Sequence, residues 1–456
     1  MTKLIPAIII LVLVPLTTFA QFNISGEMTP SGMLRISDAS LIDLPFRLGN
    51  ISLDYVYGDF ELKTVTALET RWKDPEFNED MIQLREAYLM WYPVFGEVKL
   101  GKMIHAWGAA DANNPTDNLS PYDYYYMFLA GTDRKLGSMS LAVKTYVSDF
   151  QIELIALPEF EANRFPLNEP DFPINIPIPD GAKYFYPENE IEIGGRVQYA
   201  MGIGDLTASY FKGNDRSFSP AGLEIDLSPM LSGTMGGVPN FISHLTYRET
   251  DAIGLDAVLF PGNWTFRTEL AYFRTKTPEI DYAMSKFTYD AEYLQSVFQV
   301  EYAFANTVQL MGQFISNKTQ KVESAMEKDG NFQGLEFMLQ DTSDHTLDPF
   351  RAQFAQMGVP DFSAGMGTPF ALIADQVVIL SSMVTLLDNS LELNGMLMVN
   401  LEETGYMANI GSTYSIREGL NLETTLGYFI GGDEEGNRFK QLEDFSNVNL
   451  GLSYSF

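Results

Sequence analysis

The C-terminal segment alternates polar or small side chains with apolar ones from Asn447 to Phe456. A repeat of two residues predicts a β-strand whose two faces differ in polarity. The segment Leu420–Ile430 has the same pattern, with leucine and tyrosine on one face and asparagine and glutamate on the other. Because a charge that faces lipid at mid-membrane costs several kcal/mol, we expect the apolar rows to face hydrocarbon and the polar rows to line a lumen.

Segments with this pattern recur along the chain and are joined alternately by short turns and long connections. This rhythm predicts an all-β protein, a transmembrane antiparallel up-and-down β-barrel with long outer loops and short periplasmic turns. A soluble sandwich would instead bury one row against a second sheet. We expect 16–18 strands, since the short segment 206–212 is also compatible with a loop. The predicted strands are 22–36, 46–57, 60–72, 82–92, 97–103, 135–146, 150–157, 190–201, 206–212, 244–260, 264–275, 293–304, 308–317, 372–387, 391–400, 407–416, 420–430 and 446–456.

The N-terminal segment has the form of an export signal. Lys3 precedes an apolar stretch that is too short to span a bilayer, and small residues stand at Thr18 and Ala20. An N-terminal anchor helix is the alternative. We therefore predict a signal peptide at 1–20 and an outer-membrane barrel at 21–456, with both termini periplasmic. Loop insertions are expected at 105–134, 159–188, 213–243 and 322–370, and within the last of these 348–357 is expected to be a capped helix that either plugs the barrel or docks on its rim.

The chain contains no cysteine, which excludes a lipoprotein anchor and thiolate metal sites. Its formal net charge is −31, and more than half of that excess falls in the expected outer loops. Such loops repel nucleic acid and attract cations or divalent-bridged lipopolysaccharide. The lumenal rows carry charges of both signs, which predicts passage of polar solutes with a weak preference for cations. The charged residues expected in these rows are Lys63, Arg71, Arg196, Arg267, Glu61, Glu69, Glu192, Glu269, Glu301 and Glu392.

Residues 84–88 read Leu-Arg-Glu-Ala-Tyr and are followed by a strand with Leu-Gly-Lys. Trp-Gly-Ala-Ala-Asp stands at 107–111, Asn-Pro at 114–115, and Pro-Tyr-Asp at 121–123. In these motifs the chain resembles a porin-like family of Gram-negative outer-membrane proteins catalogued as a domain of unknown function. The resemblance implies a substrate-conducting or lipid-linked envelope barrel, in some members associated with export machinery.

The loop 105–134, which carries these motifs, has two possible positions. It could fold into the lumen and narrow it, or it could stay outside as a lid. Oxygen ligands at Asp111, Asn113 and Asp117 make a weak calcium candidate, but Asp and Asn are also common where loops cap their own backbone. No cofactor is predicted. The candidate pore and constriction residues are Arg85, Glu86, Trp107, Asp111, Asp117, Asp123, Lys63, Arg71, Arg196, Arg267 and Glu269.

We predict no enzymatic activity. The three histidines stand in no recognisable nucleophile, metal or phosphate motif, and in Ser243-His244 adjacent strand residues point to opposite faces. The predicted function is a porin-like channel or transporter for small polar or amphiphilic solutes, with a link to envelope lipid or export traffic. The alternative is a non-conducting structural or partner-binding barrel. Expected partners are outer-membrane lipid and lipopolysaccharide, the barrel assembly machinery and small solutes, and a homotrimer is expected by resemblance to porins.

Overall fold

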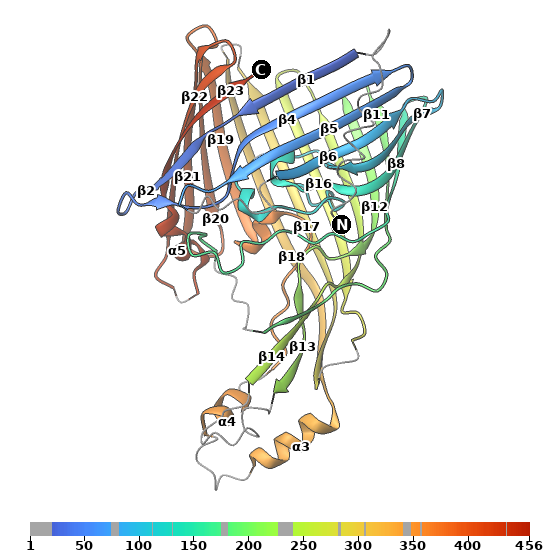
Figure 1. The fold of residues 1–456 in the computed structure, drawn as a ribbon, viewed down its shortest axis with the longest axis vertical. Coiled ribbons are helices and arrows are strands. Elements are labelled where there is room, and N and C mark those ends of the chain that lie inside the picture. The colour runs from blue at the N-terminus through green and yellow to red at the C-terminus, as the bar shows by residue number, and fades with distance from the viewer. Residues whose placement is uncertain are drawn as a thin grey trace.

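The chain forms a closed antiparallel barrel of 18 strands, so the upper end of the predicted range is correct (Figure 1). The computed structural model describes residues 21–73, 82–111, 113–129, 131–174, 181–226, 240–280, 284–304, 307–340, 348–355, 358–434 and 436–456. The predicted signal peptide therefore lies outside the described residues. The barrel strands are β1 (Gln21–Met28) continued by β2 (Ser31–Arg35), β4 (Phe46–Tyr57), β5 (Phe60–Thr70), β6 (Ile82–Trp91), β7 (Gly96–Met103), β8 (Ser138–Val147), β9 (Phe150–Leu157), β11 (Glu192–Met201), β12 (Gly204–Asn214), β15 (Glu249–Leu259), β16 (Trp264–Lys276), β17 (Ser285–Ala303), β18 (Val308–Lys328), β19 (Gln376–Leu386), β20 (Leu391–Asn400), β21 (Gly405–Arg417), β22 (Leu420–Gly431) and β23 (Asn447–Ser455).

The barrel closes through its first and last strands. β23 pairs with β22 on one side, and on the other side with β1 and β2, where Glu27 lies opposite Ser455 and Ser31 opposite Gly451. The first strand is interrupted between β1 and β2, where Pro30 has no N–H to donate to the ladder. Pairing around the whole circumference leaves no open sheet edge, which a sheet in lipid requires.

The alternation correctly predicted the outward face of strands whose two rows differ in polarity, such as β22 and β23. On β23 the side chains of Leu450 and Tyr454 are exposed, whereas Ser453 between them is buried inside the barrel. Exposed rings also gather near the short turns, as expected for an interfacial aromatic girdle. This group comprises Tyr57, Phe60, Trp91, Tyr92, Phe95, Tyr146, Phe150, Phe260, Trp264, Phe304, Tyr454 and Phe456.

Both ends of the described chain lie at the short-turn end of the barrel. Gln21 pairs with Val56, two residues before the β4–β5 turn, and Tyr454 pairs with Leu420, which begins β22 after a short turn. Gly58 in the first of these turns has a φ of +59°, a left-handed conformation that favours glycine. The long connections all leave from the opposite end.

At that opposite end, part of the chain forms an arm that projects away from the barrel (Figure 1). β17 and β18 are longer than predicted and continue as a hairpin, and β13 (Ser219–Asp226) pairs with the start of β17. The predicted strand 244–260 is wrong as one strand, because its first part belongs to β14 (Asn240–Thr246), which pairs with β13 and with β10 (Lys183–Phe185).

The arm also contains helices α3 (Gly330–Leu339) and α4 (Asp348–Ala355), so the helix predicted at 348–357 exists. It does not plug the barrel, because Phe354 stacks on Phe332 at a ring distance of 5.0 Å within the arm. No helix in the described part of the chain is both long and apolar enough to cross a membrane. The remaining short elements are β3 (Leu41–Ile42), η2 (Tyr124–Tyr126), η3 (Gly131–Arg134), η5 (Pro369–Leu372), α5 (Arg438–Leu442) and η6 (Glu443–Phe445).

Candidate functional site

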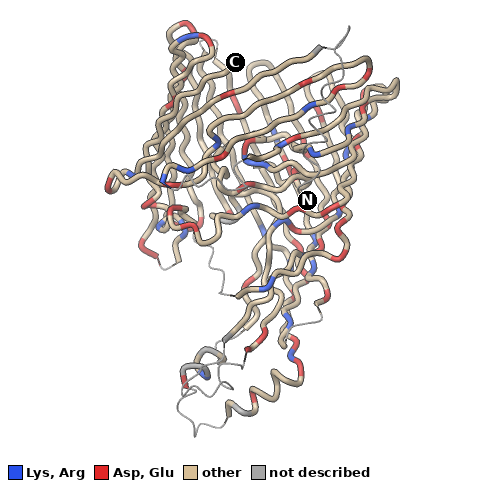
Figure 2. The backbone as a smooth tube through the Cα atoms, viewed as in Figure 1, with Lys and Arg blue, Asp and Glu red and all other residues tan. Residues whose placement is uncertain are grey.

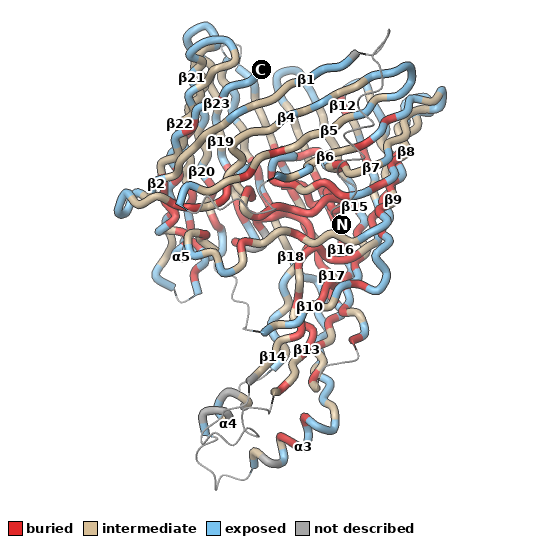
Figure 3. Tube along the Cα trace, viewed as in Figure 1, coloured by how far each residue is buried: buried red, intermediate tan, exposed pale blue. Residues whose placement is uncertain are grey.

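The connection between β7 and β8, residues 104–137, folds into the barrel, and we call it the inward loop. Its Trp107 is 4% exposed, and Leu119 and Asp123 are fully buried. Buried residues accordingly form a band across the middle of the barrel in Figure 3. Of the two positions considered from the sequence, the lumenal one is therefore observed.

The carboxylate of Glu269 on β16 anchors the inward loop to the barrel wall. Its Oε1 accepts hydrogen bonds from the backbone N–H groups of Ala109 and Ala110, both at 2.6 Å, and from Asn114 Nδ2 at 3.0 Å. Its Oε2 accepts from the Thr116 backbone N–H at 3.4 Å and hydroxyl at 2.9 Å. Glu269 itself is fully buried, so these donors replace the water that a carboxylate requires.

Steric constraints at this anchor require the glycine of the Trp-Gly-Ala-Ala-Asp motif. Gly108 has a φ of +98°, and a Cβ on it would lie 2.6 Å from Glu269 Oε1. A larger residue would be strained and would separate the loop backbone from the carboxylate. The motif that carries the family resemblance is thus, in this chain, the segment that contacts Glu269.

Arg267, two residues before Glu269, links the tip of the loop to two strands. Its guanidinium lies 3.0 Å from Asp111 Oδ1 and 2.8 Å from Glu301 Oε1, and it donates to the Ala109 carbonyl at 3.0 Å. Gln299 Nε2 donates to the second oxygen of Asp111 at 2.7 Å. Asp111 remains about half exposed, so this paired group borders open space.

The start of the loop is fixed on the neighbouring strands. Trp107 Nε1 donates to Glu153 Oε2 of β9 at 3.1 Å, and Arg196 of β11 pairs with the same oxygen at 2.7 Å. Ile104 N donates to Glu86 at 3.0 Å, and at the other end of the loop Arg85 pairs with Asp133 at 3.1 Å. A bulge in the β5–β6 pairing at this point lets consecutive residues of β6 both reach the loop.

Asp117 and Asp123 are buried within the loop and have separate partners. Asp117 lies 2.5 Å from Lys135 Nζ, in a pair that is almost fully buried, and Asp123 pairs with Arg164 at 3.1 Å. Burial lowers the pKa of Lys135 and raises the pKa of Asp123.

The calcium candidate is not assembled as the sequence suggested. Asp111 is paired with Arg267, Asn113 donates to Gln313 at 3.2 Å, and Asp117 is paired with Lys135. In the described ranges, no group of three or more histidine, aspartate or glutamate side chains is placed to hold a metal ion.

Two candidates lie apart from this group. Lys63 is on the lumenal row of β5, opposite Tyr88 and Asp54. Arg71 was expected on a lumenal row of the same strand, but β5 ends at Thr70, and Arg71 pairs with Glu169 of the insertion 159–188. It therefore helps to hold an outer loop instead.

A second segment also enters the barrel, and the sequence did not reveal it. In residues 358–374, the Met366 carbonyl accepts from Gln295 Nε2 at 3.0 Å and the Thr368 N–H donates to Gln295 Oε1 at 2.8 Å. A Cβ on Gly367 would lie 1.6 Å from Gln295, so this close approach requires glycine. A small cavity of about 10 Å³ lies between the two inward segments, with Asp117 and Tyr122 on one side and Gly365 on the other. The available signal was the pair of glycines in Ala364-Gly365-Met366-Gly367.

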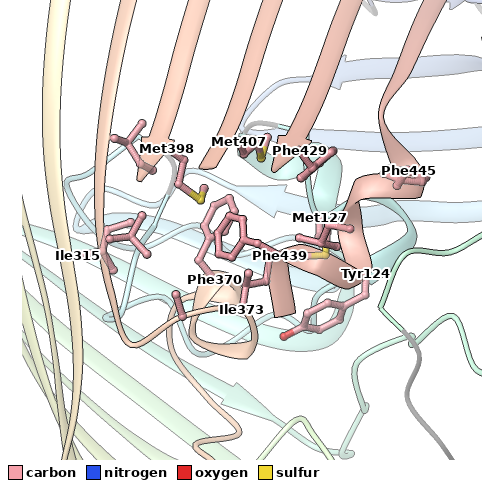
Figure 4. Packing of buried hydrophobic residues seen from close by; sticks show 14 of the residues in the cluster. Tyr124, Met127, Ile315, Phe370, Ile373, Met398, Met407, Phe429, Phe439 and Phe445 are labelled. Atoms are coloured by element: carbon pink, nitrogen blue, oxygen red, sulfur yellow. The ribbon is translucent and has the colours of Figure 1, made fainter. Parts of the chain in front are cut away.

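The inner wall has two zones, which corrects the expectation of a uniformly polar lumen. On β5 to β18, charged and polar side chains share the wall with buried apolar side chains such as Tyr88, Phe211 and Phe273. Part of the wall on β17 to β22 is apolar and covered by loop residues (Figure 4). This lumenal apolar cluster includes Val297, Ile315, Val377, Ile379, Met398, Met407 and Phe429 from the strands, and Tyr124, Met127, Phe370, Ile373, Phe439, Leu442 and Phe445 from the loops. Figure 2 shows positive and negative residues interspersed where the loops meet the barrel.

The described histidine contacts are structural in character. His105 lies 2.8 Å from Ser140 Oγ, but both are buried, and burial with the nearby Lys135 lowers the pKa of His105 to about 3. His244 contacts Glu224 at 3.2 Å on β13, rather than the adjacent Ser243.

No protein-family model matches the chain, and a search of curated proteins finds no match either. Among solved structures, the outer membrane protein opdK from Pseudomonas aeruginosa is similar at 10% identity and a TM-score of 0.50, with 96% of this chain and 99% of that chain covered. OccAB3 of Acinetobacter baumannii gives 9% identity, a TM-score of 0.50 and the same two coverages. The chain has the fold of an outer-membrane porin. The family suggested by the motif at 107–123 remains a prediction.

Proposed function

We propose that the protein is a channel or transporter for small polar or amphiphilic solutes in the outer membrane of a Gram-negative bacterium. The observation that carries the proposal is the inward loop, held on Glu269 across the inside of a closed barrel. A barrel of this strand number is wide enough for an aqueous lumen unless loops fill it. The loop then acts as the constriction, with Arg267, Asp111 and Glu301 at its border.

The two zones of the inner wall support the solute class. Ion-paired groups such as Arg196 with Glu153 offer both hydrogen-bond donors and acceptors to a solute, without strong selection for one sign of charge. The lumenal apolar cluster offers a surface to the apolar part of an amphiphile. A link to envelope lipid or export traffic belongs to the same proposal and rests on the family resemblance.

The remaining parts of the proposal follow from this location. The short-turn end, with both chain termini, faces the periplasm, and the arm and long loops face outward. The exposed apolar belt contacts lipid, the acidic loops meet lipopolysaccharide through divalent cations, and the terminal strand is read by the barrel assembly machinery. We propose a homotrimer without cofactor or enzymatic activity.

Reconstitution of the purified protein in planar bilayers tests the channel proposal. Discrete conductance steps are expected, and liposomes that contain the protein should swell in small neutral solutes but not in large ones. Preparations that are folded by heat-modifiability on gels and yet give neither steps nor swelling would contradict it.

A second candidate is a non-conducting structural or partner-binding barrel. The specific observation that favours it is the packed interior, where Phe439, Met398 and Ile379 are each about 1% exposed. Absence of conductance together with a stoichiometric envelope partner on purification would support this candidate over the channel.

A further inference from the structure

A partly open cavity of about 500 Å³ lies among the outer connections. Its walls come from the insertion 159–188, the segment before β13, residues 361–365 and α5. All four belong to connections at the end of the barrel opposite the short turns, so the cavity is reached from that side. The volume is within the range typical of small-molecule binding sites.

Aromatic rings form much of the wall. Phe165 and Phe218 meet edge to face at 5.4 Å, and Phe362 lies beneath the Arg248 guanidinium at 4.6 Å. Tyr289 also lines the cavity, and its hydroxyl donates to the Pro360 carbonyl at 2.8 Å, which fixes the ring. Such rings offer flat apolar surface to a ligand ring at low entropic cost.

The cavity wall carries little net charge. Arg248 is paired with the buried Asp215 at 3.0 Å and donates to the Ser363 carbonyl at 2.6 Å, so its charge is neutralised within the protein. The other charged residues of the lining, Asp361 and Arg438, are exposed and have opposite signs. An ionic ligand would lose hydration here without gaining a matching countercharge.

The floor of the cavity connects to the interior of the barrel. Ile373 and Leu442 line the cavity and are also members of the lumenal apolar cluster. An apolar group in the cavity therefore lies next to the apolar zone of the inner wall, while the exposed Gln441 offers hydrogen bonds to a polar head group.

We propose that this cavity binds a small uncharged amphiphile, composed of an apolar ring and a hydroxyl-rich head group, before it enters the barrel. This inference rests on the proposed channel function and names its substrate class. The ring lies against Phe362 and Phe218, and the head group faces the outer solution.

Isothermal titration of the full-length protein in detergent tests this with three matched compounds. Phenyl β-D-glucopyranoside has both parts, phenyl β-D-glucuronide adds a carboxylate to the same skeleton, and glucose lacks the ring. We expect the glucoside to bind, the glucuronide to bind at least fivefold more weakly, and glucose not to bind. Equal or tighter binding of the glucuronide would overturn the proposal, as would absence of glucoside binding.

Two phenylalanine substitutions locate the site. Phe362→Ala should weaken glucoside binding about tenfold, because it removes the ring surface. Phe337→Ala on α3 removes an equally large, exposed ring outside the cavity and should leave the affinity unchanged. Unchanged affinity in Phe362→Ala would place the ligand elsewhere and overturn the assignment.

Bilayer conductance of the same preparation separates the two proposals. Glucoside binding without conductance would leave the cavity proposal standing and defeat the channel proposal. Conductance without glucoside binding would do the reverse.

Discussion

At the scale of single residues, Glu269 is a principal anchor of the inward loop. Its carboxylate accepts five hydrogen bonds from the loop. Glu269→Ala leaves buried donors unpaired at about 1–3 kcal/mol each. We expect the loop to become sensitive to protease and the free energy of unfolding to fall by roughly 3 kcal/mol or more. Glu423→Ala, on the lumenal row of β22, serves as the matched control, and equal effects from both variants would contradict the anchor.

The buried pair of Lys135 and Asp117 gives a second test at this scale. Lys135→Met leaves the Asp117 carboxylate buried without a countercharge, which typically costs about 3–5 kcal/mol. Adding Asp117→Asn to this variant removes the stranded charge and should restore much of the stability. Urea unfolding of the three proteins measures the effect, and a double variant less stable than Lys135→Met would show that the pair is not the cause.

At the scale of elements, an engineered disulfide tests where the loop lies. A Cβ on Gly254 of β15 would lie 3.2 Å from Thr116 Cβ, which is near the separation that a disulfide needs. The chain has no cysteine, so Thr116→Cys with Gly254→Cys gives a single defined pair. We expect near-complete oxidation in the folded barrel, detected by mass spectrometry after proteolysis. A reduced pair under mild oxidant would contradict the lumenal position.

The contact between the first outer connection and the insertion 159–188 should depend on pH. Asp171 accepts from the Asp43 N–H at 2.9 Å and pairs with Arg35 at 2.8 Å. Burial acts to raise the pKa of Asp171, but these contacts lower it below its ordinary value of 3.8. Because the pKa of Asp171 is lowered on folding, the ionised carboxylate stabilises the folded contact at any pH above the ordinary pKa. This stabilisation is lost as the pH falls through the pKa of the folded state.

Hydrogen exchange at pH 5 and pH 2.5, corrected for intrinsic rates, measures this loss. Exchange in residues 41–45 should accelerate at pH 2.5 in the native chain. Asp171→Asn should remove most of that difference, whereas Glu188→Gln, in an exposed part of the same insertion, should keep it. Equal pH dependence in all three proteins would show that another group is responsible.

The elements themselves were largely predictable from alternation, because each strand has one lipid face and one inner face. The predicted strand boundaries were wrong where a strand extends beyond the lipid and no longer has a lipid face. β17 and β18 continue beyond the barrel, where Met326 of β18 packs against the arm cluster of Ile225, Phe332 and Leu335. Residues 244–246 alternate like the strand that follows, but they pair with β13 in the arm.

The site was predictable as a set of residue types but not as an arrangement. The motif at 107–123 lies in the loop that enters the barrel, but the sequence left both a lumenal and an outer position open. Its main partner, Glu269, is separated from Ala110 by 159 residues, and nothing in the alternation of β16 distinguishes that glutamate from Glu301. The apolar inner zone was missed because segments such as Val377–Leu380 are apolar on both faces, so the pattern does not reveal which face is buried.

At the scale of the whole molecule, the charge balance predicts the ion selectivity. The formal net charge is −31, but the inner wall pairs its cations with carboxylates. Outer negative charge raises the local concentration of cations, and a balanced constriction selects weakly. We expect reversal potentials in a potassium chloride gradient to show a modest preference for potassium that declines at high salt. Strong anion selectivity would contradict the assignment of the inner wall.

The central claim is that the inward loop is the narrowest part of a conducting barrel. The side chains of Trp107 and Leu119 flank the loop tip and both pack against Gly194 of β11. Replacing residues 109–117 with Gly-Gly-Ser should preserve the barrel and remove the contacts to Glu269. As the control, replacing α3 by the same linker removes a segment of the arm.

Single-channel conductance of these two variants and the native chain in planar bilayers is the most direct measurement. The account predicts at least a twofold increase in conductance for the loop replacement and no change for the α3 replacement. A folded loop variant whose conductance equals that of the native chain would contradict the account.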